Sequence, residues 1–143
     1  YALACYKSNL IAAIGSVSGY MLQSTSSVSE SECTPSHSIP LIKLHGTTDY
    51  YDGEGVYNSV DSVLNFWVSF NNTNTDPIIN NIDDNGTSIT SYKYENGDNN
   101  VSVEHYKIIG GEHVWFNNDF NGKNTGQLIW DFVSKYDIDG LIE

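Results

Sequence analysis

Positive charge is scarce in this sequence. Lys and Arg together number 6 against 18 Asp and Glu, which gives a formal net charge of −12 and a pI near 4.4. Nucleic-acid affinity depends on basic side chains that neutralise phosphates, and anionic membrane surfaces attract the same groups. The composition therefore excludes nucleic acid and anionic membranes as expected partners, and we infer no substrate from the acidity itself.

Long hydrophobic runs are also missing. The longest apolar stretches are far shorter than the roughly 18 to 20 residues that span a bilayer, so we predict no membrane span. The 143 residues have the length of one domain and show no internal repeat. We expect residues 1–143 to belong to a single domain.

Cysteine occurs twice, as Cys5 and Cys33. Two thiols cannot complete a zinc site, and their spacing is not that of a Cys-x-x-Cys redox motif. Two interpretations stay open, one disulfide or two buried free thiols. We favour the disulfide, because Cys33 lies in a segment rich in Ser, Thr and Pro where an unpaired thiol would be a liability, and this pairing would indicate an oxidising compartment.

The first half of the chain predicts two strands and a helix. Residues 11–17 and 39–44 are apolar runs, the second nearly continuous, as is typical of a parallel strand covered on both faces. A long polar loop is expected between them at residues 24–38. In residues 59–70 apolar side chains recur at the spacing of an amphipathic helix, with Ser59 as its N-cap.

The second half predicts a strand pair and a terminal helix. We expect residues 71–85 to be a connection with little regular structure, since they are polar and contain a proline. Residues 87–94 and 101–109 read as two strands of a loose hairpin, and residues 124–136 as a helix. The succession predicts an α/β sandwich with a mostly parallel sheet and flanking helices.

An acid follows the second predicted strand. Residues 45–49 read His-Gly-Thr-Thr-Asp, which places Asp49 beyond the carboxyl end of a strand, where open α/β sheets bind ligands. A carboxylate there can accept a hydrogen bond from an imidazole and stabilise its charged form. The alternatives are that Asp49 only caps its own turn, or that Asp52 is the acid.

A base follows the last predicted strand. His113 comes directly after Gly110-Gly111-Glu112, and an imidazole suits general base catalysis because it titrates near neutrality. We predict that Asp49 orients His113. His45 is expected to bond a neighbouring loop in a supporting role at most, while His37 and His105 are expected at the surface or half-buried.

Aromatic side chains follow both motifs. Tyr50 and Tyr51 come after the acid, and Trp115 and Phe116 after the base. They would form the rim of a cleft that could hold an aromatic acyl group or a polymer chain. Core packing is an equally good explanation for any one of them.

A calcium loop is the remaining candidate. Residues 81–86 are similar to the first half of an EF-hand, but Asn81 and Tyr92 occupy the places of the initial Asp and the closing bidentate Glu. We therefore expect no metal and no other cofactor.

The order Asp then His matches a Ser…Asp…His triad, but the sequence contains no Gly-x-Ser-x-Gly turn to present the serine. Residues 15–19 come near it, yet Val17 stands at their centre, so neither Ser16 nor Ser18 is expected to be a nucleophile. The chain also opens inside a predicted helix over residues 1–6, which we interpret as a truncated beginning.

Five segments together carry a resemblance. Residues 3–5, 11–14, 40–49, 66–67 and 110–115 are similar to the polyhydroxybutyrate depolymerase and feruloyl esterase-like family of α/β-hydrolases, and the similarity extends over essentially the whole chain. The resemblance implies that Asp49 is the triad acid and His113 the base. It also implies that the nucleophile precedes Tyr1, so that residues 1–143 are the C-terminal part of one α/β-hydrolase domain.

These observations lead to an expected function. The intact protein is predicted to be a secreted or periplasmic serine esterase, a carboxylic ester hydrolase that works through an acyl-enzyme. Its substrate would be a small ester, a polyester or a plant cell-wall ester, and the fragment alone would be inactive. The alternatives are a noncatalytic carbohydrate- or polymer-binding domain and a peptidase of the same fold.

Overall fold

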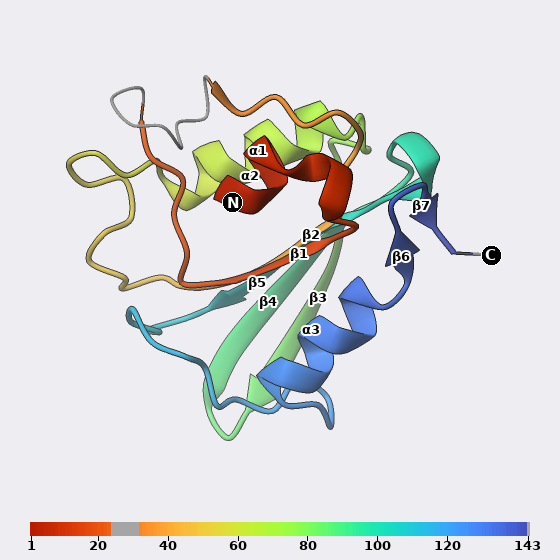
Figure 1. Ribbon diagram of the computed structural model, residues 1–143. Helices are drawn as coiled ribbons and strands as arrows, with labels where there is room; N and C mark the ends of the chain where they lie inside the picture. The colour runs from red at the N-terminus through yellow and green to blue at the C-terminus, as the bar shows by residue number, and fades with distance from the viewer. Residues whose placement is uncertain (24–31, 143) are drawn as a thin grey trace.

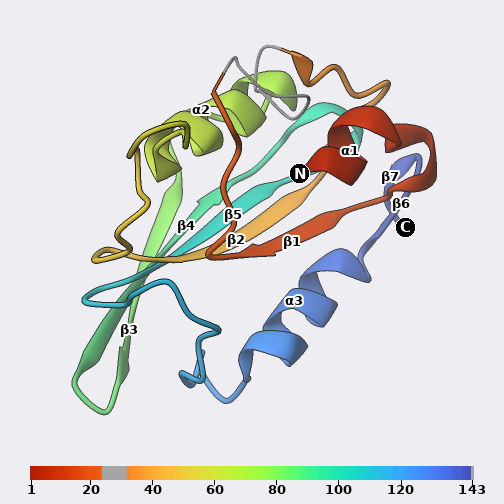
Figure 2. The ribbon, with the colours of Figure 1, turned by 60° about the vertical axis from the view of Figure 1, so that its left-hand side comes forward.

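The computed structural model describes residues 1–23 and 32–142, so part of the predicted long loop, residues 24–31, lies outside the described residues. The fold has three layers (Figures 1 and 2). Helices α1 and α2 lie on one side of a five-stranded sheet, and α3 lies on the other. The α/β class predicted from the sequence is confirmed. The helices are α1 (Ala2–Tyr6), α2 (Val60–Phe70) and α3 (Thr125–Val133).

The sheet is mixed. Its strands are β1 (Ile14–Val17), β2 (Leu41–Gly46), β3 (Ile78–Asp84), β4 (Thr87–Tyr94) and β5 (Val103–Ile108). They run in the order β1-β2-β5-β4-β3, with β1, β2 and β5 parallel and with β4 antiparallel to both of its neighbours. The expected parallel arrangement thus holds for the three strands that carry the candidate site. A separate small hairpin joins β6 (Tyr136–Asp137) to β7 (Gly140–Leu141).

Strand β2 is the centre of the molecule, and every one of its residues is buried. Two cores meet at its opposite faces. Leu41 belongs to the core under α1 and α2, while Ile42 and Leu44 belong to the core under α3. The continuous apolar run predicted this double burial, because a strand covered by helices on both faces cannot alternate between core and solvent.

Both long helices begin at side-chain caps. The Ser59 hydroxyl accepts a hydrogen bond from the Ser62 N–H at 3.1 Å, which confirms the predicted N-cap of α2. At α3 the Asn124 side chain accepts from the Gln127 N–H, and the Gln127 side chain accepts in return from the Asn124 N–H. These contacts satisfy N–H groups that have no partner within the first helical turn.

Several predicted boundaries were wrong. Strand β1 begins at Ile14 and not at residue 11, because a 3₁₀ turn at Ser8–Leu10 precedes it. Strand β2 begins after Pro40, which has no N–H to give to a sheet, and β5 spans 103–108 and not 101–109. Helix α3 ends at Val133, because Tyr136 already pairs within the β6–β7 hairpin.

The largest error concerns residues 71–85, which were expected to lack regular structure. Residues 78–84 form β3, and a two-residue turn, Asn85-Gly86, leads directly into β4. Both turn residues have positive φ, 51° and 92°, as Asn-Gly hairpin turns require. The segment that resembled a calcium loop is therefore a strand and its turn.

The disulfide is present. Cys5 in α1 is bonded to Cys33, and both residues are buried. It confirms the favoured pairing and ties the first helix to the segment that leads into β2. None of the described helices reaches the length and apolar character that a membrane crossing needs.

Candidate functional site

Two loops meet at the carboxyl edge of the parallel strands, one after β2 and one after β5. Gly46 ends β2 and lies against the backbone of Gly111, so closely that a methyl group on Gly46 would collide with the Gly111 carbonyl. A sharp exit from the strand would be the obvious reason for a glycine at this place. The φ of Gly46 is not positive, however, and the close backbone approach is what requires glycine here.

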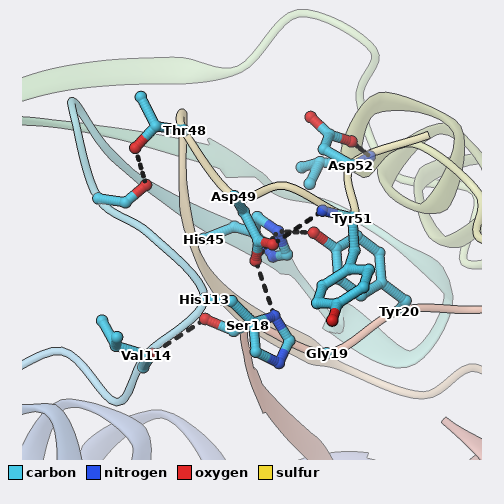
Figure 3. Close-up of polar contacts among 12 residues, drawn as sticks. Ser18, Gly19, Tyr20, His45, Thr48, Asp49, Tyr51, Asp52, His113 and Val114 are labelled. Atoms are coloured by element: carbon cyan, nitrogen blue, oxygen red, sulfur yellow. Dashed lines mark hydrogen bonds and ion pairs between the residues drawn. The ribbon is translucent and has the colours of Figure 1, made fainter. Parts of the chain in front are cut away.

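Hydrogen bonds fix the two loops to each other. The Thr47 N–H donates to the Ile108 carbonyl at 2.9 Å, and the Gly110 N–H donates to the Thr47 hydroxyl at 2.8 Å. The N–H and hydroxyl of Thr48 both donate to the Gly111 carbonyl, at 2.9 and 2.8 Å. The Ser18 hydroxyl, at the end of β1, holds the same loop by donating to the Val114 carbonyl at 2.9 Å (Figure 3).

This arrangement brings together the two predicted site residues. His113 Nδ1 lies 3.0 Å from Asp49 Oδ2. Because a carboxylate can only accept, Nδ1 carries a proton and donates it to Asp49, and Nε2 lies on the opposite edge of the ring. The Asp49 side chain is fully buried, whereas the His113 side chain is 50% exposed. Figure 3 shows Nδ1 of His113 pointing at the carboxylate.

The alternatives for the acid are also decided by contacts. Asp52 accepts the Val60 N–H at 2.7 Å and so supports the start of α2, not the imidazole. Asp49 does cap its own turn, because Oδ1 accepts the Tyr51 N–H at 3.2 Å. The turn-capping interpretation and the pairing with His113 therefore hold together, one on each carboxylate oxygen.

Two further residues, His45 and Tyr20, surround the buried carboxylate. His45 Nε2 lies 3.0 Å from Asp49 Oδ2 and 2.8 Å from the Tyr20 hydroxyl. His45 thus contacts a neighbouring loop, as predicted, and it also touches the acid itself. Tyr20 was not among the predicted site residues. The signal that could have found it is its place just after β1, whose carboxyl end lies beside that of β2.

The electrostatics of the cluster favour an ionised acid and a neutral His45. Burial by itself would raise the pKa of Asp49, but hydrogen bonds from the Tyr20 hydroxyl, the Tyr51 N–H and His113 hold that pKa below its usual value. Burial and then the nearby Lys43 lower the pKa of His45. Burial and the hydrogen bond to Asp49 raise the pKa of Tyr20. At neutral pH the carboxylate is therefore the charged member of this group.

The predicted aromatic rim is formed in part. Tyr50 and Trp115 are 79% and 58% exposed, and the Tyr51 ring meets the His113 ring edge-on with centroids 5.3 Å apart. Phe116 is a correction, because it is buried in the core under α3. An open groove of about 370 Å³ is lined among others by Glu112, Val114 and Trp115, which are the neighbours of His113 in the sequence.

The other predicted residues lie as follows. Ser16 is within β1 and its hydroxyl is buried. Ser18 follows the strand with φ 49°, and the described residues directly after it, 19–23, are not helical. His37 is half-buried, as expected. His105 is buried within β5 against Tyr92, so the prediction that it lies at the surface or half-buried was wrong. Within residues 1–23 and 32–142 no cluster of His, Cys, Asp and Glu could hold a metal ion.

Fold and site together describe an α/β protein with a carboxylate–imidazole pair at the carboxyl edge of its parallel strands. A comparison with models of known protein families found no match. A comparison with curated protein sequences found none either. The function is therefore argued from the geometry of the site.

Proposed function

We propose that the intact protein is a serine esterase in which Asp49 orients His113. The observation that carries the proposal is the 3.0 Å contact between His113 Nδ1 and the buried Asp49 carboxylate. It turns Nε2 away from the carboxylate on a half-exposed side chain, so that this nitrogen is placed to act as the general base toward a hydroxyl.

The reaction would proceed in two steps, acylation of the serine and then hydrolysis of the acyl-serine. His113 Nε2 takes the proton of a serine hydroxyl while the serine oxygen adds to the ester carbonyl, and the same proton then passes to the departing alcohol. Water next adds to the acyl carbonyl as it gives a proton to His113, and this proton passes to the serine oxygen when the acyl-serine bond breaks and the acid is released. In both steps the Asp49 carboxylate stabilises the imidazolium that forms.

The nucleophile is proposed to precede Tyr1, on a strand parallel to β1. Two observations support this place. The motifs around Asp49 and His113 resemble a family in which the serine lies upstream, and β1 is the terminal strand of the described sheet, with β2 on one side. A strand added at β1 would end near the same carboxyl edge, where ligands of open α/β sheets bind. Residues 1–143 alone are then expected to be inactive.

The proposed substrate is a small ester, a polyester or a plant cell-wall ester that reaches the protein outside the cytoplasm. The exposed aromatic rings beside His113 support an extended or aromatic substrate. The Cys5–Cys33 disulfide supports a secreted or periplasmic location, since such bonds persist in oxidising compartments.

The protein encoded by the complete gene provides the test. We expect it to hydrolyse p-nitrophenyl esters or methyl ferulate, and a fluorophosphonate probe to label one serine upstream of Tyr1. Asp49→Asn should lower kcat by roughly 10⁴-fold, as loss of the orienting acid does in such triads. Asp52→Asn is the matched control, because the asparagine oxygen can still accept the Val60 N–H. No ester hydrolysis, or activity insensitive to Asp49→Asn, would overturn the proposal.

The exposed Tyr50 and Trp115 rings favour a binding domain as the second candidate. That function predicts polymer binding that is lost in Trp115→Ala and unchanged in Asp49→Ala and His113→Ala, with no serine labelled. Cleavage of peptide anilides in preference to esters, with the same dependence on Asp49, would instead indicate a peptidase.

A further inference from the structure

Tyr20 occupies a position that the proposed triad does not require. It follows the turn at the end of β1, and its hydroxyl lies 2.8 Å from His45 Nε2. The same hydroxyl bonds to Asp49, whose Oδ2 is 3.0 Å from that nitrogen. An imidazole, a phenol and a carboxylate therefore meet at one place (Figure 3). The carboxylate side chain is fully screened from solvent.

The Asp49 carboxylate determines which ring nitrogen of His45 carries the proton and where the Tyr20 hydroxyl points. If His45 carried its proton on Nδ1, the Nε2 lone pair would face the Asp49 charge at 3.0 Å. The Nδ1–H would also be a buried donor without an acceptor, because His45 Nδ1 has no hydrogen-bond partner among the described residues. With the proton on Nε2 both penalties disappear. The Tyr20 oxygen then accepts from His45, and its own proton is left to donate to Asp49.

We propose that Tyr20 is a positioning residue of this site, one that passes a hydrogen bond from the neutral His45 to the Asp49 carboxylate. The phenol thereby gives the acid a second side-chain hydrogen bond, besides the one from His113, without adding a positive charge to it. A cation at His45 would compete with the His113 imidazolium for the same carboxylate oxygen, whereas a neutral donor chain does not.

The Tyr20 ring has a second contact with the site. It lies parallel to the His113 ring, at an interplanar angle of 5° with centroids 6.0 Å apart. One side chain therefore contacts the acid through its hydroxyl and the base through its ring. Tyr20→Phe separates the two contacts, because it removes the hydroxyl and keeps the ring.

The hydroxyl is tested by NMR on the protein from the complete gene. In Tyr20→Phe we expect the pKa of the Asp49 carboxyl, followed by its ¹³C shift, to rise by about one unit, since a carboxylate loses a donor. Tyr57→Phe is the control, because the Tyr57 ring packs on Tyr20 with centroids 5.3 Å apart and belongs to the same aromatic cluster. An Asp49 titration that is identical in wild type and Tyr20→Phe would overturn the inference.

The tautomer of His45 can be measured in the wild-type protein, so this test does not depend on whether a variant folds. The ¹⁵N shifts of His45 at pH 7 should show a protonated Nε2 and an unprotonated Nδ1. The opposite tautomer, or a charged His45 at this pH, would overturn the inference, because the Tyr20 proton would then not be directed to Asp49.

The catalytic consequence rests on the proposed function. In the active esterase Tyr20→Phe should lower kcat by roughly tenfold, with KM little changed, and Tyr57→Phe should not. If the protein cleaves no ester while Asp49 and His45 titrate as described, the proposed function fails and the role of Tyr20 stands. If activity is found and kcat is unchanged in Tyr20→Phe, the role of Tyr20 fails alone.

Discussion

The two faces of strand β2 differ sharply in chemistry although both are buried. Toward α3 the strand presents Ile42 and Leu44, which pack in a core of aliphatic and aromatic side chains. Toward α1 and α2 it presents Leu41, then Lys43 and His45, and all three are screened from solvent. The next strand, β5, repeats the pattern, with buried His105 paired to Lys43 in register.

The apolar face of β2 therefore contributes mainly to stability, whereas its polar face carries groups that can titrate. Burying an apolar side chain stabilises the fold, whereas burying an amine or imidazole costs free energy unless the group is neutral or hydrogen-bonded. The polar face leads along β2 from Lys43 to His45 and ends at the buried Asp49. We therefore expect changes on the apolar face to alter stability at every pH, and changes on the polar face to alter its dependence on pH.

The largest expected effect lies on the apolar face. Leu44→Ala should lower the free energy of unfolding by about 2–5 kcal/mol, because Leu44 is fully buried and its loss leaves a cavity. Urea titration at pH 7 measures the loss, and Leu44→Ile serves as a control that should cost less than about 1.5 kcal/mol. A loss that varied strongly with pH would contradict the proposed division of the two faces.

The next effect concerns Lys43, whose Nζ donates to the Gly19 carbonyl at 2.6 Å. Burial lowers the pKa of Lys43 to about 7, while the unfolded chain keeps a value near 10.4. Between these values the unfolded state binds more protons, so stability rises with pH by up to about 1.4 kcal/mol per unit. Unfolding measured at pH 7, 8 and 9 should show this rise in the wild type and lose it in Lys43→Met.

The control for Lys43 is Lys107, which lies on the same face of the sheet but is exposed. Lys107→Met should keep the wild-type rise in stability between pH 7 and pH 9. If both variants behaved alike, the rise would not come from the buried amine.

The smallest effect is expected at His105. Burial lowers its pKa to about 3, so stability that is complete above the unfolded value near 6.5 is lost as the pH falls toward 3. His105→Phe keeps the stack on Tyr92 and removes the titration. The free energy of unfolding of the variant minus that of wild type should be up to about 2 kcal/mol more favourable to the variant at pH 5 than at pH 8. An equal difference at both pH values would contradict this account.

The sequence predicted that Asp49 and His113 lie together because each stands on a short motif after an apolar run. Asp49 and His113 could be paired from their motifs alone, since strands that end at one edge of a parallel sheet bring their following loops together. The helix at Ser59 was equally readable, because its cap and its spacing of apolar residues agree. In each case the signal is local or periodic.

The missed features depend on contacts between distant segments. Tyr20 carries no motif, and it reaches Asp49 only because β1 pairs with β2. Strand β3 escaped recognition because it is mostly exposed, so no alternation of polar and apolar residues marks it, although the Asn85-Gly86 turn was readable. His105 looked half-buried because the polar face of an internal strand is indistinguishable in sequence from a solvent face.

The contact between Gly46 and Gly111 has a consequence for motion. The loop that carries the acid and the loop that carries the base share a backbone contact and the hydrogen bonds of Thr47 and Thr48. Neither loop can open by a local fluctuation without breaking these hydrogen bonds, so we expect the two loops to unfold locally as one cooperative unit. The backbone positions of Asp49 and His113 are thus coupled, because neither loop can move away without breaking hydrogen bonds to the other.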